Sequence, residues 1–256
     1  MAASLDAFEM RLIDKMLSLY FAPALPESGI VSITDEEAHH AISVMRTKVG
    51  DSVLLTDGKG EWAEGHVREI SKKSFEVEIT KRGFQSEVLP RLVVIQALTK
   101  SDRIKETLEL LTEAGADRII PWQAQRSISQ WQPDHNAKWS ATLRAATKQS
   151  RRFRIPEIGQ PFDLATATYL KSPKSKVILF HESATTKLSE YFKIGPGDEV
   201  EEIVIVIGPE GGITEAEQEG FRELGAQIAH LGEPVFRSAH AGVAALAAIQ
   251  ALLARW

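Results

Sequence analysis

The chain has 256 residues, an apolar fraction of 43%, no cysteine and a net charge of −5. This length allows one large domain or two small ones, and the apolar content is ample for a packed core. The lack of cysteine excludes disulfide scaffolds, thiolate zinc sites and cysteine nucleophiles. The net charge argues against a protein that coats nucleic acid over its whole surface, although it leaves room for local basic patches.

Residues 1–19 carry apolar side chains at roughly helical spacing, at Phe8, Leu12, Met16 and Leu19. We interpret them as an N-terminal extension, either a short helix or a tail. Charged residues interrupt this stretch, so it lacks the apolar core of a signal peptide, and nothing in the chain approaches a transmembrane span. We therefore expect a cytoplasmic protein without a membrane partner.

Residues 20–88 have the pattern of short strands, which predicts a small β-barrel-like module. Thr34 to Glu37 has the pattern of a capping box, which predicts a helix that runs to Arg46. Asp57-Gly58 is a hairpin turn signal. The lysines and arginines of the loops are either a solvated basic face or phosphate contacts of a nucleic-acid-binding barrel. Strands are expected at residues 30–33, 53–56, 62–70 and 74–80.

Residues 89–256 alternate apolar strands with amphipathic helices, which predicts an α/β domain with a mostly parallel sheet. Its last helix, from Ser238 to Trp256, has small apolar residues on nearly every side. Such a helix should be buried, either against a second subunit or within its own domain. Strands are expected at residues 92–98, 118–122, 176–180, 203–207 and 227–231, and helices from Ser101, Asp134 and Thr214.

A glycine-rich turn follows the most apolar of these strands. The β-branched run 203–207 predicts a strand buried on both faces, and a capping box at Thr214 to Glu217 opens the next helix. The glycine spacing between them fits neither the dinucleotide-binding nor the P-loop fingerprint. Pro209 removes a donor N–H and Glu210 adds negative charge, so the turn suits a neutral or cationic ligand, unless it is an ordinary βα turn.

Three expected strands end at one edge of the sheet, in Phe180-His181-Glu182, Gly208 to Gly211, and Leu231-Gly232. Ligands bind at this edge in parallel sheets, so we expect the pocket here. His240 begins the last helix, where the helix dipole disfavours an imidazolium. It is either a proton acceptor or a merely capping or exposed histidine. The chain shows no histidine pair at metal-ligand spacing, so we expect no metal site.

A basic run surrounds Phe153 at the end of another helix. Cations are favourable at a helix C-terminus through the dipole alone. Four cations around an aromatic ring also make a good contact surface for phosphates and bases, and together with Arg126 they favour the nucleic-acid interpretation. The cations of the run are Lys148, Arg151, Arg152 and Arg154.

The turn Ile207 to Gly212, the downstream Leu231-Gly232-x-x-x-x-Arg237 and the alanine-rich last helix resemble the bacterial 16S ribosomal RNA uridine-N3 methyltransferases of the SPOUT superfamily. The turn and the loop together are far more specific than either alone, and the likeness covers nearly all of the chain after Leu19. It continues in residues 57–60, 96–100, 113–115, 148–152 and 179–184.

This resemblance implies a trefoil-knotted SPOUT methyltransferase domain over residues 89–256, preceded by a small PUA-like RNA-binding β-barrel over residues 20–88. It also implies a homodimer that binds S-adenosylmethionine in the knot, near the subunit interface. The implied reaction is methylation of N3 of a specific uridine in 16S ribosomal RNA, within the small ribosomal subunit.

The chemistry of this reaction suggests roles for three residues. Our hypothesis is that Arg237 orients the uracil or stabilises its developing negative charge, and that Glu210 and His240 are the candidate proton acceptors. The resemblance itself implies that Arg46, Arg126, Arg151 and Arg152 face RNA. Residues on cofactor-loop positions are Phe180, His181, Ile207, Gly208, Pro209, Glu210, Gly211, Leu231, Gly232, Phe236 and Arg237.

The chain departs from the family's pattern after Arg237. Members usually continue with threonine, a polar or acidic residue and threonine, whereas this chain has Ser238-Ala239-His240. The departure motivates one alternative, an RNA-binding ribosome-assembly factor of the same fold without catalysis. A second alternative is a SPOUT methyltransferase that acts on another RNA or on another atom.

Overall fold

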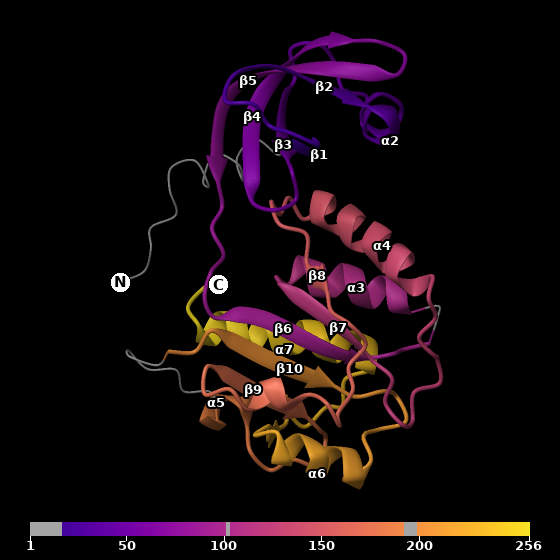
Figure 1. The fold of residues 1–256 in the computed structure, drawn as a ribbon, viewed down its shortest axis with the longest axis vertical. Helices are drawn as coiled ribbons and strands as arrows, with labels where there is room; N and C mark the ends of the chain where they lie inside the picture. The colour runs from indigo at the N-terminus through magenta and orange to yellow at the C-terminus, as the bar shows by residue number, and fades with distance from the viewer. Residues whose placement is uncertain (1–16, 101–102, 192–198) are drawn as a thin grey trace. The chain divides into compact units, whose positions relative to one another are not determined.

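The structure, a computed structural model, describes residues 17–100, 103–191 and 199–256. The chain forms two compact units (Figure 1). The first comprises Met1–Glu87 and Thr147–Ile155, and the second comprises Val88–Ala146 and Pro156–Trp256. The basic run at residues 148–154 therefore folds with the N-terminal strands, although the sequence places it in the second domain. As functional domains, the boundaries at residues 20, 88 and 89 stay predictions.

The first unit is a five-stranded mixed sheet with a short helical segment beside it (Figure 1). Its elements are β1 (Ser18–Phe21), β2 (Gly29–Thr34), α2 (Asp35–His39), the π-helix η1 (His40–Val44), β3 (Ser52–Thr56), β4 (Glu61–Ile70) and β5 (Ser74–Phe84). The strand order is β1-β3-β4-β5-β2, and the β1–β3 pair is parallel. The four later strands agree with the sequence prediction, whereas β1 spans the expected boundary between the extension and the barrel at residues 19 and 20. Most of the extension falls outside the described residues.

The capping box expected at Thr34 is wrong. The Thr34 hydroxyl makes no cap hydrogen bond and donates instead to the Asp35 carboxylate at 2.7 Å. The Glu37 carboxylate, which should have reached back to Thr34, accepts a hydrogen bond from the Lys148 ammonium at 2.7 Å. A charged donor makes a stronger hydrogen bond than a backbone amide does. The Glu37 carboxylate therefore pairs with Lys148 and not with the backbone of Thr34. The helical segment then continues as η1 and ends at Val44.

The second unit is a parallel six-stranded sheet in the order β11-β9-β10-β6-β7-β8. This confirms the α/β class with a mostly parallel sheet, while the trefoil knot stays a prediction. Its elements are β6 (Arg91–Ala97), α3 (Ile104–Glu113), β7 (Arg118–Trp122), α4 (His135–Gln149), β8 (Glu157–Ile158), the 3-10 helix η2 (Thr168–Lys171), β9 (Ser175–Phe180), α5 (Leu188–Tyr191), β10 (Glu202–Ile207), α6 (Glu215–Glu223), β11 (Gln227–Ala229) and α7 (Ser238–Leu252); the last three residues of α4 belong to the first unit.

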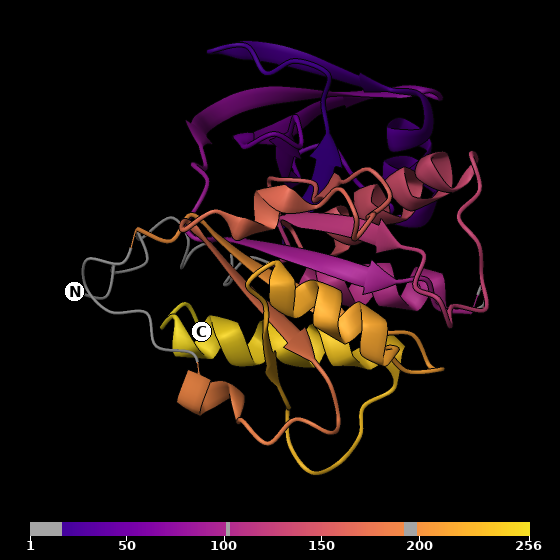
Figure 2. The ribbon, with the colours of Figure 1, turned by 60° about the horizontal axis from the view of Figure 1, so that its bottom comes forward.

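Helices cover both faces of this sheet (Figure 2). On one face α7 packs against α3, β6 and β10, and a Cβ on Gly242 would lie only 2.7 Å from the Leu111 side chain. On the other face Phe162 stacks on Phe221 of α6 at 5.4 Å, and Trp122 meets both rings edge-on. One side of α7 is thus buried within its own unit. This is one of the two ways of burying the helix that the sequence predicted, the other being a second subunit.

Phe153 joins the stretch Thr147–Ile155 to the sheet of the first unit. Its ring is 7% exposed and stacks on Trp62, with centroids 5.7 Å apart. Its carbonyl oxygen accepts hydrogen bonds from Gly60 N at 3.0 Å and from Thr56 Oγ1 at 3.1 Å. The interpretation of Phe153 as a base contact is therefore wrong, because the ring belongs to the core.

Substituting Phe153 by alanine should lower the free energy of unfolding by about 3–5 kcal/mol, because it removes a large buried ring and leaves a cavity against Trp62. Urea denaturation measures this loss. Ile128→Ala is the matched control, because that side chain is 66% exposed. A Phe153→Ala loss as small as that of the control would show that the ring is not part of the core.

Candidate functional site

A cavity of about 600 Å³ opens at the carboxyl edge of the second unit's sheet. Its walls are the segments that follow β9, β10 and β11 together with the start of α7. The volume lies within the range of about 300–1,000 Å³ typical of small-molecule sites. Every residue that the sequence assigned to the cofactor lines this cavity: Phe180, His181, Ile207, Gly208, Pro209, Glu210, Gly211, Leu231, Gly232, Phe236 and Arg237.

Part of the lining was not assigned to the cofactor from the sequence. Gln218 is the residue that follows the capping box Thr214 to Glu217, and it lines the cavity. The predicted capping box could have identified it, because residues in the first turn of a helix lie close to the turn that precedes the helix. Arg126 was assigned to RNA but lies in the cavity wall. The remaining residues lie within or next to the predicted motifs and are Glu182, Gly212, Ile213, His230, Pro234, Val235, Ser238 and Ala241.

Glu217 holds two loops of the cavity together. Its carboxylate accepts hydrogen bonds from Thr214 N at 2.9 Å and from Thr214 Oγ1 at 2.8 Å, while Glu217 N donates to Thr214 Oγ1 at 3.3 Å. This confirms the predicted capping box. The same carboxylate accepts a hydrogen bond from Gln125 N at 2.7 Å. The segment after β7 is therefore fixed beside the glycine-rich turn.

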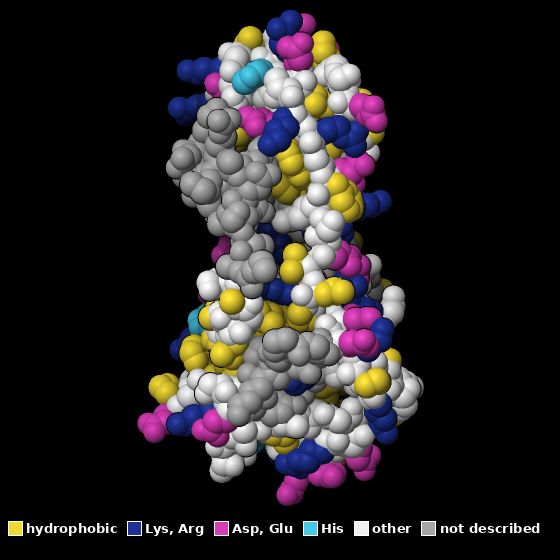
Figure 3. Space-filling view, turned by 90° about the vertical axis from the view of Figure 1, so that its left-hand side faces the viewer, with side chains coloured by type: hydrophobic (Ala, Val, Ile, Leu, Met, Phe, Trp, Pro, Cys, Tyr) yellow, Lys and Arg dark blue, Asp and Glu magenta, His cyan; other side chains and the backbone are white. Residues whose placement is uncertain are grey.

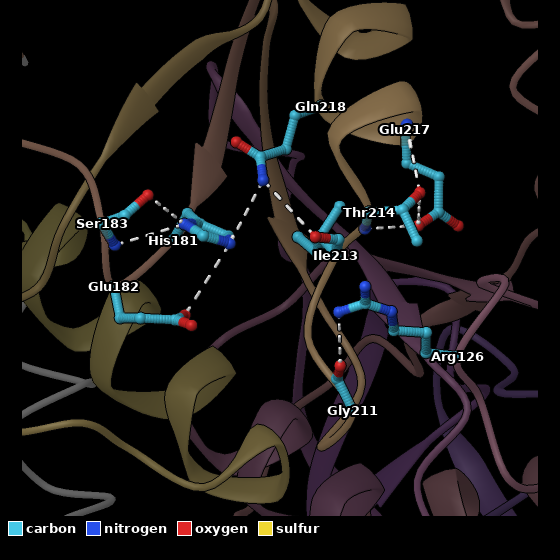
Figure 4. Close-up of polar contacts among 9 residues, drawn as sticks. All are labelled: Arg126, His181, Glu182, Ser183, Gly211, Ile213, Thr214, Glu217 and Gln218. Carbon is cyan, nitrogen blue, oxygen red and sulfur yellow. Dashed lines mark hydrogen bonds and ion pairs between the residues drawn. The ribbon is translucent and has the colours of Figure 1, made fainter.

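Arg126 contacts the turn directly (Figure 4). Its Nη1 donates to the carbonyl oxygen of Gly211 at 3.1 Å. A Cβ on Gly211 would lie 2.9 Å from the Arg126 Cβ and 3.0 Å from the Arg126 carbonyl oxygen. Only glycine allows this approach without a backbone shift, so the glycine at this position has a packing reason.

His181 lies among polar groups on the opposite side of the cavity (Figure 4). Ser183 N donates to its Nδ1 at 3.2 Å, so a neutral ring carries its hydrogen on Nε2. That Nε2 lies 3.3 Å from the Gln218 amide nitrogen and 3.9 Å from a Glu182 carboxylate oxygen. The same Gln218 nitrogen donates to the Ile213 carbonyl oxygen at 3.4 Å, so the amide lies between the His181 ring and the end of the glycine-rich turn.

Ser238 joins the start of α7 to the glycine-rich turn. Its buried hydroxyl donates to the Gly208 carbonyl oxygen at 2.6 Å and accepts from Gln96 Nε2 at 3.3 Å. The residue before it, Arg237, is the N-cap of α7 and lines the cavity with an exposed side chain. The bond from Ser238 thus sets the position from which Arg237 reaches the cavity.

The structure brings two of the three catalytic candidates together. Arg237 and Glu210 both line the cavity. His240 does not line it, and its Nε2 lies 3.3 Å from a Glu106 carboxylate oxygen on α3. Ala239 is buried and likewise outside the lining. The sequence departure after Ser238 therefore falls largely on residues that do not face the cavity.

Two of the predicted RNA contacts are engaged within the first unit. The Lys148 ammonium bonds to the Glu37 carboxylate. The Arg154 Nε donates to the Gln85 carbonyl oxygen at 2.9 Å, and its guanidinium lies over the Phe84 ring. These contacts give both side chains structural partners. The other candidates are Arg46, Arg151 and Arg152 in the first unit and Arg126 in the second.

The lining has the chemistry that a cationic ligand with an apolar body requires. Phe180, Ile207 and Leu231 supply apolar surface, and Glu182 and Glu210 supply carboxylates.

Among the described residues, no group of three or more histidine, aspartate or glutamate side chains could hold a metal ion. Within the same residues, every helix is too short or too polar to cross a membrane.

Comparisons with known proteins give consistent matches. A family model described as an RNA methyltransferase domain matches residues 86–250, and one described as an RNA methyltransferase PUA domain matches residues 33–80. The ribosomal RNA small subunit methyltransferase E of Mycobacterium bovis is 33% identical over 247 residues, which cover 93% of each chain. Its namesake from Bacillus subtilis is 29% identical over 243 residues, which cover 88% of this chain and 91% of that one.

Solved structures agree with these relatives. The ribosomal RNA small subunit methyltransferase E of Neisseria gonorrhoeae, bound to S-adenosyl methionine, is 26% identical with a TM-score of 0.82 and covers 92% of this chain and 98% of that one. A probable rRNA-methyltransferase from Porphyromonas gingivalis is also 26% identical, with a TM-score of 0.76, and covers 93% of this chain and 99% of that one.

Substituting Ser238 by alanine should lower the free energy of unfolding by about 1–3 kcal/mol, because the Gly208 carbonyl and the Gln96 amide both lose this buried partner. Thermal denaturation measures the change. Ser189→Ala on α5 serves as the control, since that residue is exposed. Equal melting curves for the two variants would rule out Ser238 as the link between α7 and the turn.

Proposed function

This chain belongs to the RNA methyltransferase family, and from that premise we propose that it transfers a methyl group from S-adenosylmethionine to N3 of a uridine in 16S ribosomal RNA. The observation that carries the proposal is the cavity at the sheet edge, which gathers all the residues assigned to the cofactor. Relatives named for small-subunit ribosomal RNA methylation and a similar structure with bound S-adenosyl methionine support the substrate and the methyl donor.

The residues present fit the proposed methyl donor. When bound, S-adenosylmethionine supplies an electrophilic methyl group on a sulfonium and a neutral thioether leaving group. Phe180, Ile207 and Leu231 would hold its adenosyl part, and the carboxylates of Glu182 and Glu210 favour its positive charge. The volume of about 600 Å³ is ample for a ligand of this size.

The chain's own residues would then position the uracil and manage one proton. Methylation of N3 requires loss of the imide proton and an in-line approach to the methyl group, so positioning supplies much of the catalysis. Arg237 orients the uracil or stabilises its developing negative charge. Glu210 becomes the preferred proton acceptor, because His240 lies outside the cavity lining. Since N3 lies on the base-pairing edge, the uridine must be unpaired or extruded from its helix.

The non-catalytic alternative loses its motivation. It rested on Ala239 and His240, and neither residue lines the cavity, whereas Ser238 keeps a hydroxyl at its position.

An RNA substrate follows from the family, and we propose that the chain meets it within the small ribosomal subunit. The cytoplasm, where ribosomal subunits are assembled, is the location that fits such a substrate.

We also propose that the enzyme is a homodimer through the outer side of α7. Ala244, Ala247 and Ala248 are only half-buried, and Ala251 and Leu252 are exposed. On the face seen in Figure 3, hydrophobic side chains gather on the second unit, where the C-terminal end of α7 lies. Monomers rarely leave such a surface to water, which supports a partner there.

Wild-type protein should incorporate a methyl group at uridine N3 of 16S ribosomal RNA, as mass spectrometry of the nucleosides measures. Substituting Arg237 by alanine should lower kcat by at least about 10²-fold, the cost of removing one donor aimed at developing charge. Binding of S-adenosylmethionine, measured by calorimetry, should be largely kept.

The control for this prediction is Arg222→Ala, because Arg222 pairs with Glu219 on α6 and does not line the cavity. Unchanged turnover in Arg237→Ala would remove the residue from the mechanism. A wild-type protein that binds no S-adenosylmethionine would instead favour the assembly factor. Methylation of another RNA or another atom would favour the second alternative.

Light scattering after gel filtration should give the wild-type protein twice its chain mass of 28.3 kDa. Ala251→Glu should shift it toward the monomer, because it places a charge on the apolar side of α7. Ala216→Glu on the exposed side of α6 is the matched control. A dimer that survives the α7 charge would place the subunit interface elsewhere.

A further inference from the structure

Three residues of the first unit that are not glycine adopt a left-handed backbone. They are Asp35 with φ 57°, Arg46 with φ 55° and Arg151 with φ 56°. Arg46 follows the end of η1 and Arg151 follows the end of α4, and a left-handed residue just past a helix end commonly closes the last turn. At both places a main-chain hydrogen bond spans this residue, from Thr47 N to the Ala41 carbonyl oxygen and from Arg152 N to the Thr147 carbonyl oxygen. Two of the three are arginines, and they come from distant stretches of the chain. One group of side chains, Tyr20, Glu37 and Lys148, packs beside both of these helix ends.

Tyr20 of β1 contacts both helix ends, through Thr47 after η1 and through Lys148 in the last turn of α4. The side chain is fully buried, and its ring packs edge-on against Phe75 at 5.2 Å. Its hydroxyl shares a hydrogen bond with the Thr47 hydroxyl at 2.8 Å, directly after Arg46. On the other side, the Lys148 ammonium lies 5.5 Å from the centre of the same ring. This distance is within the range of a cation–π contact.

Glu37 and Lys148 form an ion pair beside Tyr20. We call these three side chains the hub. The two side chains are each 16% exposed, so water and salt screen the pair weakly. Phe21 N donates a further hydrogen bond to the Glu37 carboxylate at 3.4 Å, which ties the pair to β1. Arg151 N donates to the Lys148 carbonyl oxygen at 3.1 Å. This main-chain bond closes the last turn of α4, and the Lys148 side chain of the same turn is anchored to β1 through Glu37.

His40 supports this assignment of charges. Burial, and after it the positive charge of Lys148, lowers the pKa of the His40 imidazole, while Glu37 raises it. The His40 Nδ1 is buried and has no hydrogen-bond partner among the described residues. A neutral ring at this place adds no second positive charge beside Lys148.

We propose that Tyr20, Glu37 and Lys148 are positioning residues that lock the backbone at Arg46 and Arg151, so that both guanidinium groups meet RNA phosphates in a preset geometry. The proposal rests on the proposed function and deepens it by naming what shapes the RNA contact. Arginine suits this role because its planar fork binds phosphate with fixed geometry. A preset backbone lowers the ordering cost of binding.

The proposal gives Lys148 a role other than the one the sequence suggested. A cation in a basic run reads as a direct phosphate contact, but this ammonium is buried against Glu37 and Tyr20. Its removal should therefore weaken RNA binding through Arg46 and Arg151. A direct phosphate contact and a positioning residue differ in one measurable way. Only the loss of a positioning residue changes how much RNA affinity is lost when Arg46 or Arg151 is replaced.

The test uses the full chain with Lys148→Met, which keeps an unbranched side chain of similar length and removes the ammonium group. Affinity for a 16S ribosomal RNA fragment at fixed salt should fall at least about fivefold, within the range of coupling between contacting residues. KM for RNA should rise while kcat at saturating RNA and the Kd for S-adenosylmethionine stay within about twofold, because the cavity lies in the other unit. Lys174→Met is the matched control, since it breaks an exposed ion pair with Glu201.

A double-mutant cycle separates positioning from direct contact. Arg46→Ala should weaken RNA binding less in the Lys148→Met background than in the wild type, and Arg151→Ala should behave likewise. Equal costs in both backgrounds would overturn the proposal. Wild-type affinity in Lys148→Met would overturn it as well.

Amide hydrogen exchange tests the hub without RNA. Thr47 N bonds to the Ala41 carbonyl oxygen and Arg151 N to that of Lys148, so both amides should exchange at least about tenfold faster in Lys148→Met. If that variant does not fold, Tyr20→Phe replaces it, because it removes only the hydroxyl bond to Thr47. Unchanged exchange would overturn the hub. Faster exchange in a chain whose wild type binds no RNA would instead overturn the proposed function, and with it the RNA role of the hub.

Discussion

The bond from the Ser238 hydroxyl to the Gly208 carbonyl oxygen, at 2.6 Å, is the contact on which the site depends. It joins the beginning of α7 to the residue that follows β10, and the two elements also pack against each other. Because Arg237 precedes Ser238 and Glu210 follows Gly208, this one bond brings the residues of both loops to the same cavity. The neighbouring contacts from Glu217 and Arg126 then fix the remaining wall.

The cavity also shows why a parallel sheet suits this chemistry. The strands β9, β10 and β11 end side by side, so their loops converge without any long connection. Each loop supplies a different property, with apolar surface at Phe180 and Leu231 and a carboxylate at Glu210. Because the sheet beneath is buried and rigid, the loops inherit a fixed geometry, as catalysis by positioning requires.

Much of this arrangement was predictable from the sequence. The apolar runs gave β7 with its exact bounds, and the capping box at Thr214 gave the start of α6. The resemblance supplied the cavity residues, because the glycine-rich turn and the Arg237 loop carry a specific pattern. Local signals failed where a distant residue decides the outcome. Thr34 lost its capping partner to Lys148, 111 residues beyond Glu37, and no local pattern reveals such a pairing.

The construction of the first unit from two stretches of chain affects how the protein is made. During synthesis, residues up to Glu87 leave the ribosome well before Thr147–Ile155 exist. Until then Trp62 lacks the ring that covers it and Glu37 lacks its counter-ion. Domains usually fold in order as the nascent chain emerges. Here the first unit must wait for a segment encoded inside the second, so the two halves of this enzyme mature together.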